Sequence, residues 1–555
     1  MSRKNKQRLE LTWIGKGQEP KLEPRILIED TEKSYGDKQT ENMLIHGDNL
    51  LALKALEQDF TGKIKCIYID PPYNTGSAFE HYDDGLEHSM WLNLIHARLK
   101  ILWNLLDKKH GSLWISIDDR EMPYLRVILD EICSRSNFVA TNVWQKRYSR
   151  ENREAIGDAH EYIVTYAKNP PLFKSYRNKI PLGKKQLKNY KNPNKDPKGP
   201  WQTVSLTAQG YRPNQMYEIT APNGKKHKPP ANSCWKVTQP VYENLLKENR
   251  IYFGKDGNGV PRRIHYLKNA EGLVPWTWWN HEEVGHTGES KKEIQSLFGD
   301  KKVFDTPKPE RLIERIIHIA TNPGDLVLDS FLGSGTTAAV AHKMNRRWIG
   351  VELGDHANTH CLPRLKKVVD GLDEGGITKS TEWRGGGGFK FYNLAPSLLQ
   401  KDDFGNWVID QSYNADMLAA AMAKHEGYDY APSEQLFWKQ GQSTEQDFIF
   451  TTTQFVTVQL LDKIQEQMQD NESLLICCKS FQEACDGKYA NINIKKIPVM
   501  LLGRCEFGRD DYSLNIITMP VDEAEEPFVP AARKMEQEKQ EAEKNSPGAQ
   551  QNLFE

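Results

Sequence analysis

The stretch LVLDSFLGSGTTAAVAHKMNRRWIGVEL, residues 326–353, carries most of the information about the fold. It holds an apolar run ending at Asp329, a glycine loop, a run with helical spacing, and a second apolar run ending at Glu352. Gly333 and Gly335 give the spacing G-x-G-x-x-A, and Glu352 follows Gly333 by nineteen positions. This arrangement is typical of a sheet that binds a nucleoside-containing cofactor, with the acid accepting hydrogen bonds from ribose. The alternative is a tight strand–helix turn followed by a solvated glutamate.

Alternating strand and helix patterns continue on both sides of this stretch. Residues 42–60 predict a strand, a Gly-Asp turn and a helix. Further strands are predicted at 65–70, 111–118, 138–145, 325–331 and 347–353, and further helices at 90–108, 122–133, 308–321 and 336–345. We therefore predict an α/β protein with a three-layer, doubly wound, Rossmann-like sheet, an inserted middle region and a smaller C-terminal α/β domain.

Breaks in the pattern suggest six regions. The RGGGG run at 384–388 predicts a linker, and the charged tail contains few aromatic residues and is expected to be largely disordered. The predicted regions are an N-terminal extension at 1–40, two halves of the main domain at 41–150 and 301–384, an inserted region at 151–300, an accessory domain at 389–520, and the tail at 521–555.

Composition limits the class of protein. The 555 residues include 74 Lys and Arg against 75 Asp and Glu, so net charge indicates no particular partner. No run of about 18 apolar residues and no apolar signal segment occur, so we expect neither a membrane span nor secretion. The eight cysteines form no CxxC pair, so no metal site or disulfide framework is indicated and a cytoplasmic location is expected.

Residues 171–230 are strongly basic. They contain 13 Lys and Arg against two acids, a formal excess of 11 positive charges, interleaved with aromatic residues. One interpretation is a solvated, loop-rich insertion. The other is a surface that binds a polyanion, in which cations neutralise phosphates and aromatic rings meet bases. The second interpretation makes Lys184, Lys185, Lys188 and Trp201 candidate contacts with such a polyanion.

The stretch YIDPPYNTG places Asp70, Pro71, Pro72 and Tyr73 at the end of an apolar run. The amino group of adenine is a poor nucleophile, because its lone pair is delocalised into the ring. The Asp70 carboxylate and the Pro71 carbonyl, fixed by rigid prolines, can accept the amino protons and localise that pair toward an incoming methyl group. Tyr73 offers a stacking face to a base that has left the duplex. The alternative is a proline-rich turn capped by Asp70.

The glycine loop alone admits two ligands. A dinucleotide would place its pyrophosphate at the helix N-terminus, whereas S-adenosylmethionine has no phosphate but shares the adenosine. The chemistry of the Asp-Pro-Pro-Tyr stretch favours S-adenosylmethionine.

DPPYNTG together with DSFLGSGTT resembles the amino-methyltransferases of DNA, over about residues 40–390. The order of catalytic motif, basic region and cofactor loop is similar to the beta class of that family. Asp70 at the start of D-P-P-Y implies adenine N6 rather than cytosine N4. The middle section and GGGGFKFYNL resemble modification subunits of type III restriction–modification systems, although solitary enzymes share much of this layout.

The resemblance also implies individual roles. Asp48 in IHGDNL is similar to a segment near the cofactor's adenine, and Lys308 in FDTPKPERL to one near its methionine carboxylate. Phe331 could pack on the adenine or belong to the core. The expected cofactor-binding residues are Asp48, Lys308, Asp329, Phe331, Gly333, Gly335 and Glu352.

The resemblance implies double-stranded DNA, a second copy of the chain and a helicase–nuclease restriction subunit as partners. His160 could be a general base or a hydrogen-bonded structural residue, and PWTWWN at 275–280 could be a stacking platform or an anchor in the core. A nicotinamide-dependent oxidoreductase would explain only the glycine loop, and an inactive DNA-binding regulator only the basic segment. Cytosine N4 and RNA are nearer alternatives.

Overall fold

A computed structural model describes residues 10–73, 84–150, 155–299, 304 and 306–512. The main domain is built on a mixed sheet of 11 strands. Across the sheet lie β1 (Leu27–Glu29), β18 (Gly388–Leu394), β3 (Met43–His46), β17 (Arg347–Glu352), β16 (Leu326–Asp329), β4 (Cys66–Ile69), β5 (Ser112–Ile117), β7 (His160–Ala167), β6 (Phe138–Gln145) and β15 (Trp278–Trp279), and β2 (Tyr35–Gly36) also pairs with β18.

Strand direction identifies the edge at which a site is expected. The six strands from β18 to β5 are parallel, whereas β1 and β7 run antiparallel to their neighbours. The chain proceeds from β16 to β17 on one side and from β4 to β5 on the other. The winding therefore reverses between β16 and β4, and ligands of open α/β sheets bind beyond the carboxyl ends of strands at such a point.

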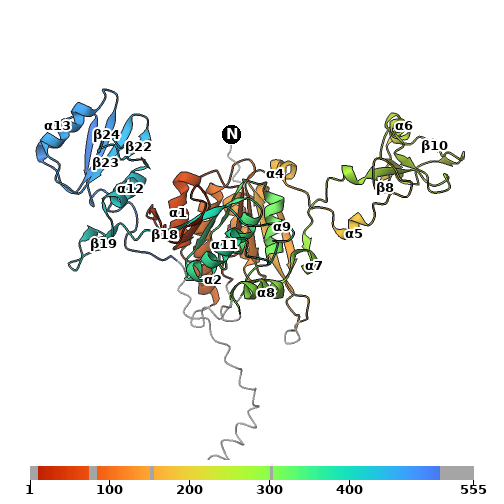
Figure 1. Cartoon of the computed structure of the whole chain (residues 1–555), viewed down its shortest axis with the longest axis horizontal. Coiled ribbons are helices and arrows are strands. Elements are labelled where there is room, and N and C mark those ends of the chain that lie inside the picture. The colour runs from red at the N-terminus through yellow and green to blue at the C-terminus, as the bar shows by residue number, and fades with distance from the viewer. Residues whose placement is uncertain (1–9, 74–83, 151–154, 300–303, 305, 513–555) are drawn as a thin grey trace, which may run out of the picture.

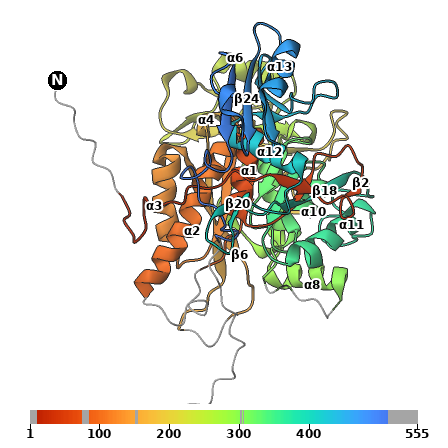
Figure 2. The same ribbon diagram turned by 90° about the vertical axis from the view of Figure 1, so that its left-hand side faces the viewer.

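Helices cover both faces of the sheet (Figure 2). One face carries α1 (Asn49–Phe60), α2 (Asp84–Leu105) and α3 (Met122–Cys133), and the other carries α9 (Glu310–Ala320), α10 (Thr336–Lys343) and α11 (Leu362–Val369). In β4, Ile67 and Ile69 pack with the first group, and Cys66 and Tyr68 with the second, since successive side chains of a strand point to opposite faces. The predicted three-layer α/β fold is confirmed.

Local signals place the helices as predicted. The helix expected at 122–133 and the strand expected at 138–145 are α3 and β6. Pro123 lies in the first turn of α3, where its missing N–H costs no helical bond. Asp48 accepts hydrogen bonds from the backbone N–H groups of Leu50 and Leu51 and so begins α1.

The inserted region is shorter than predicted. It extends away from the main domain on the right of Figure 1. Its elements are α5 (Lys184–Leu187), β8 (Trp201–Ser205), β9 (Thr207–Gln209), β10 (Ile219–Thr220), β11 (Lys226–His227), β12 (Ser233–Trp235), α6 (Gln239–Lys247), β13 (Ile251–Tyr252) and β14 (Arg262–Tyr266). The flanking elements assigned to 151–300 belong to the main domain instead, because their side chains lie in its buried core; they are β7, α4 (Pro170–Tyr176), β15, α7 (His281–Val284) and α8 (Thr287–Phe298).

The C-terminal domain lies on the opposite side of the main domain (Figure 1). A five-stranded sheet and two helices enclose its own apolar core. Its elements are β19 (Leu399–Lys401), β20 (Trp407–Ile409), α12 (Ala415–Glu426), β21 (Asp429–Tyr430), β22 (Gly441–Thr444), β23 (Asp447–Thr452), α13 (Val458–Gln467), β24 (Ser473–Cys478) and β25 (Ile492–Lys496).

Two further predicted boundaries are wrong. The extension at 1–40 contributes β1 and β2 to the main sheet, and the accessory domain cannot begin at 389, because β18 lies between β1 and β3. The glycine run is packed rather than a free linker: the backbone N–H of Asp37 donates to the carbonyl of Gly387 at 2.9 Å. The predicted tail at 521–555 lies outside the described residues. Over the described part of the chain, none of the helices combines the length and apolar character of a bilayer-crossing segment.

Candidate active site

A cavity of about 460 Å³ opens where β4 and β16 end. Asp70 and Tyr73 line it from the turn after β4, Lys308 from the segment before α9, and Phe331 and Gly333 from the loop after β16. This volume lies within the usual range of small-molecule sites. The structure therefore brings the predicted catalytic turn and the predicted cofactor loop to one place.

The Asp70 carboxylate is held by two partners. Lys308 Nζ lies 2.7 Å from Asp70 Oδ2, and the Tyr73 hydroxyl donates to Asp70 Oδ1 at 2.9 Å. Burial raises the pKa of Asp70 above its ordinary value, and the Lys308 ammonium opposes that rise. The prolines between Asp70 and Tyr73 keep the turn rigid, and the Pro72 carbonyl accepts a hydrogen bond from Trp91 Nε1 at 2.8 Å.

Lys308 is buried between two carboxylates. Its Nζ lies 3.5 Å from Glu161 Oε2 and also donates to the Tyr73 hydroxyl at 3.3 Å. Burial alone would lower its pKa, but Asp70 and Glu161 raise the pKa above its ordinary value. Lys308 was expected to contact the cofactor. Its ammonium lies in the same cavity, and in this structure its shortest ion pair is with Asp70.

Glu161 is a site residue that the sequence did not reveal. It projects from β7, accepts a hydrogen bond from the Tyr73 hydroxyl at 3.2 Å, and accepts another from Lys146 Nζ at 3.3 Å. Its side chain is almost fully buried. The available signal was a single acid within the apolar run HEYIVTYA, but the antiparallel placement of β7 beside β5 was not predicted.

The glycine loop and the acid at the end of β17 touch one another. Gly333 has φ +57° and Gly335 has φ +83°, conformations that favour glycine. The Gly333 N–H donates to Glu352 Oε2 at 2.7 Å, and the Gly354 N–H donates to Glu352 Oε1 at 3.1 Å. Burial raises the pKa of Glu352. The predicted nineteen-residue spacing thus corresponds to a direct contact.

Asp329 braces this loop from the end of β16. Its Oδ1 accepts a hydrogen bond from the Phe331 N–H at 2.9 Å, and its Oδ2 accepts one from the Thr337 hydroxyl at 2.6 Å. Burial raises the pKa of Asp329 to about 7, although the two hydrogen bonds act in the opposite direction and lower it. Phe331 lines the cavity and also packs on the apolar core, so both of the interpretations of this residue have support.

Asp48, which was expected near the cofactor's adenine, is buried outside the cavity lining and caps α1. Its side chain is 1% exposed and is not among the cavity-lining groups. One oxygen caps α1, and the other accepts hydrogen bonds from the Tyr512 N–H at 3.0 Å and Arg98 Nη2 at 3.4 Å. Both oxygens are therefore engaged by the protein itself.

The candidate DNA contacts divide into two groups. Lys184 and Lys188 are exposed on α5, while the side chain of Lys185 lies outside the described residues. Trp201 is 8% exposed, donates from Nε1 to Asn194 Oδ1 at 2.9 Å, and packs in the small core of the inserted region. Its expected contact with a base is not supported, because the ring is already covered.

The other aromatic candidates are similarly divided. Trp279 is fully buried, with its ring centroid 6.3 Å from that of Trp114, so it anchors β15 in the core. Trp276 and Trp278 are about half exposed. Within the Trp276–Asn280 segment, Trp279 therefore anchors the chain in the core, and Trp276 and Trp278 are the tryptophans exposed to solvent.

His160 belongs to a hydrogen-bonded group at the surface. Its Nε2 lies 3.0 Å from the Tyr162 hydroxyl, which donates to Asp119 Oδ1 at 2.7 Å. The ligand atoms of Asp119, Asp158 and His160 lie within 4.8 Å of one another, but both aspartates are exposed, and exposed acidic groups are common without an ion. The structural interpretation of His160 accounts for these contacts.

Comparison with known proteins agrees with this geometry. The sequence pattern of the DNA methylase family matches residues 64–360. The Mod subunit of the type III restriction-modification enzyme StyLTI from Salmonella typhimurium is 34% identical over 359 residues, covering 58% of this chain and 53% of that protein. The EcoP15I Mod subunit from Escherichia coli is 27% identical over 482 residues, covering 72% of this chain and 73% of that protein. The type II methyltransferase M.EcaI from Enterobacter cloacae is 30% identical over 318 residues, covering 56% of this chain and 66% of that protein. The chain thus spans about half the length of the StyLTI subunit.

Proposed function

This chain belongs to the DNA methylase family, and we propose on that basis that it transfers a methyl group from S-adenosylmethionine to the N6 amino group of adenine in double-stranded DNA. The observation that carries the proposal is the cavity shared by Asp70 and Gly333. Direct transfer between two bound molecules requires the group that holds the acceptor and the loop that holds the donor to meet at one place.

The residues around the glycine loop suit S-adenosylmethionine. Gly333 lines the cavity, and its positive φ angle suits a backbone that approaches a ligand closely, whereas Gly335 packs against Cys361. The Glu352 carboxylate, oriented by two backbone N–H groups, is the acceptor for ribose hydroxyls. When bound, the cofactor supplies an electrophilic methyl group.

Asp70 is the proposed acceptor for the adenine amino group. Its carboxylate is oriented before the base arrives, since Lys308 and Tyr73 each hold one oxygen. A carboxylate offers about four lone-pair sites, so the amino group can bind without displacing these two partners. The hydrogen bond draws the nitrogen lone pair away from the ring. Once the nitrogen is methylated it loses a proton, and the raised pKa of Asp70 suits it as the acceptor.

Tyr73 and the exposed lysines complete the proposed path of the DNA. A base inside a duplex cannot reach the cavity, so the adenine has to be extruded, and the Tyr73 ring is its stacking face. The inserted region, with Lys184 and Lys188 exposed, is the proposed surface for phosphate contact and sequence reading.

We further propose that the chain is a modification subunit of a type III restriction–modification system. Its similarity to the StyLTI and EcoP15I Mod subunits supports this role. The proposed partners are a second copy of the chain and a restriction subunit with helicase and nuclease activity. A DNA substrate implies a cytoplasmic location.

Methyl transfer to unmethylated plasmid tests the proposal. The plasmid is incubated with the protein and S-adenosylmethionine labelled in the methyl group, and the DNA is then digested to nucleosides. Label in N6-methyl-2′-deoxyadenosine is the expected result. Label in N4-methyl-2′-deoxycytidine would agree with the proposed mechanism but show that the target base is cytosine. Binding of the cofactor without any label in the DNA would contradict DNA as the substrate.

A further inference from the structure

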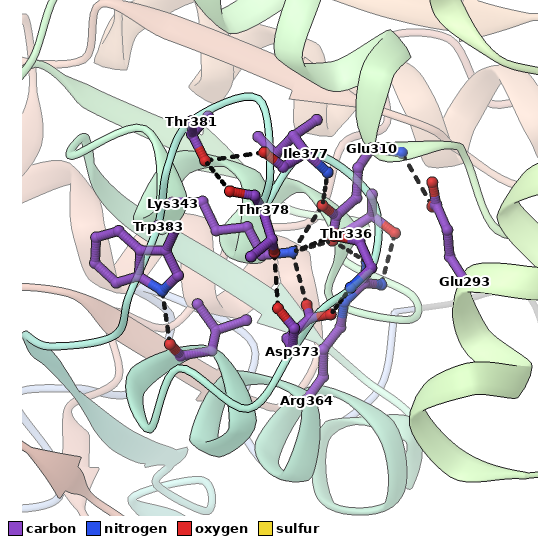
Figure 3. Close-up of polar contacts among 12 residues, drawn as sticks. Glu293, Glu310, Thr336, Lys343, Arg364, Asp373, Ile377, Thr378, Thr381 and Trp383 are labelled. Carbon is purple, nitrogen blue, oxygen red and sulfur yellow. Dashed lines mark hydrogen bonds and ion pairs between the residues drawn. The ribbon is translucent and has the colours of Figure 1, made fainter.

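A buried ionic network lies beneath the glycine loop (Figure 3). Glu310 lies between two cations: Lys343 Nζ is 2.8 Å from its Oε2, and Arg364 Nη2 is 2.8 Å from its Oε1. Lys343 Nζ is also 2.7 Å from Asp373 Oδ2. All four side chains are at most 2% exposed. Apolar packing of similar volume often stabilises a fold as well or better, so stability alone does not account for this network.

Arg364 is the member of the network that reaches the loop. Its Nη1 donates to the Ser334 carbonyl at 3.2 Å and to the Thr336 hydroxyl at 2.9 Å. These residues flank Gly335, so one guanidinium group spans the turn from which α10 begins. Figure 3 shows Arg364 extending from α11 toward Thr336 and Glu310.

The backbone around Arg364 also fits closely against the loop. A single π-helical turn, Ala357–Cys361, leads into α11. The Cys361 thiol donates to the Gly333 carbonyl at 3.1 Å, and a Cβ on Gly335 would lie 3.3 Å from Cys361 Cα. The loop therefore rests on one continuous segment, and Arg364 supplies its charged contacts.

Glu310 connects this support to the other side of the cavity. It is the first residue of α9 and follows Lys308 by two positions, and its Oε2 accepts a hydrogen bond from the Ile377 N–H at 3.0 Å. Because Lys308 contacts Asp70, the chain of contacts runs from the glycine loop through Arg364 and Glu310 to the segment that orients the catalytic carboxylate.

We propose that Arg364 is a positioning residue that holds the Ser334–Thr336 turn in the conformation that accepts S-adenosylmethionine, with Glu310 fixing the guanidinium. The inference rests on the proposed function. Arg364 touches neither substrate nor cofactor in this account. It acts by satisfying the Ser334 carbonyl and the Thr336 hydroxyl, which fixes the backbone of the turn next to Gly333, the residue whose N–H binds Glu352.

The test compares two conservative variants of the full chain. Arg364→Lys keeps a cation beside Glu310 but cannot span both that carboxylate and the two loop oxygens. Lys343→Met is the matched control, because Lys343 shares the network and its burial but contacts Glu310 and Asp373 instead of the loop. Thermal unfolding and the Kd for S-adenosylmethionine, measured by calorimetry, are recorded for both variants and the wild type.

Arg364→Lys is expected to weaken cofactor binding about tenfold, while Lys343→Met lowers the unfolding temperature and leaves the Kd within about twofold of wild type. Steady-state rates should show a higher KM for the cofactor in Arg364→Lys and a nearly unchanged kcat. Equal loss of affinity in both variants, or unchanged affinity in Arg364→Lys, would overturn the inference. Failure of the wild type to bind the cofactor would instead overturn the proposed function.

Discussion

Lys308 Nζ lies 2.7 Å from Asp70 Oδ2, although 238 positions separate the two residues in the chain. The contact joins the segment before α9 to the turn after β4, and so links the proposed cofactor loop side of the cavity to the proposed catalytic turn. It also places a cation beside a buried carboxylate that would otherwise be costly to ionise. The ionic state of Asp70 therefore depends on Lys308.

Replacement of Lys308 should change the pH dependence of methyl transfer. The Lys308 ammonium lowers the pKa of Asp70, so Lys308→Met raises that pKa further and the carboxylate ionises only at higher pH. We expect single-turnover rates to fall most at acidic pH and the midpoint of the rate profile to move to higher pH. Lys308→Arg keeps the charge and should show a smaller movement. Identical profiles for Lys308→Met and the wild type would contradict the proposed dependence.

Glu161→Gln tests the residue that the sequence did not reveal. Glutamine can still accept a hydrogen bond from Tyr73 but removes the negative charge near Lys308. We expect kcat to fall about tenfold with little change in the KM for DNA, since the positions of Tyr73 and Lys308 are affected and the DNA surface is not. Glu131→Gln is a suitable control, because Glu131 pairs with Lys16 on the outer side of α3. Equal kcat values for the two variants would argue against a role for Glu161.

Long periodic segments explain why much of the fold was predictable. The α3 helix and the β6 strand follow the predicted ranges because their apolar positions recur with a clear period. Five strands of the sheet were not among the predicted strands. Of these, β1, β2 and β15 have two or three residues each, too few to carry a period, whereas β7 and β18 have eight and seven. Pairing partners of such strands are set by tertiary contacts that the local sequence does not encode.

The site also has a part that the sequence predicts and a part that it does not. Asp70, Gly333 and Glu352 sit in motifs whose spacing predicts their neighbourhood, and the cavity and the Gly333–Glu352 contact follow from that spacing. Asp48 also sits in such a motif, yet its second oxygen is occupied by the N–H of Tyr512, 464 positions away. Contacts at such separations depend on how distant segments pack, so the local sequence does not predict the partner of that oxygen.

Asp329 provides a prediction about stability. Its folded-state pKa of about 7 exceeds the ordinary aspartate value of 3.8, so the folded state binds this proton more tightly than the unfolded state. The contribution of this group to stability is present at pH below 3.8 and is lost as the pH rises to about 7. Asp329→Asn removes the titration and can keep both hydrogen bonds. The variant's free energy of unfolding minus that of the wild type should increase between pH 4.5 and pH 7.5, by an amount on the order of a few kcal/mol. Unfolding temperatures of the two proteins, measured across this pH range, should show the same trend. A constant difference across that range would contradict the raised pKa.

The exposed lysines of α5 provide a prediction about DNA. Lys184→Gln with Lys188→Gln should weaken binding to duplex DNA, and the slope of log K against log salt should become shallower by about 1.8 if each lysine neutralises one phosphate. Lys463→Gln with Lys479→Gln removes the same charge from exposed positions of the C-terminal domain and serves as the control. The same slope in the α5 variant and the wild type would exclude this surface from phosphate contact.

We propose that the Asp70 carboxylate binds the adenine amino group and accepts its proton during methyl transfer, in the cavity that it shares with the glycine loop. The most direct test of this proposal is single-turnover transfer to DNA by the wild type and Asp70→Asn, with the Kd for S-adenosylmethionine and for DNA measured on the same preparations. The account predicts a rate at least about 10³-fold lower in Asp70→Asn, with both Kd values within a few fold of wild type. Transfer at a near wild-type rate by Asp70→Asn would contradict it.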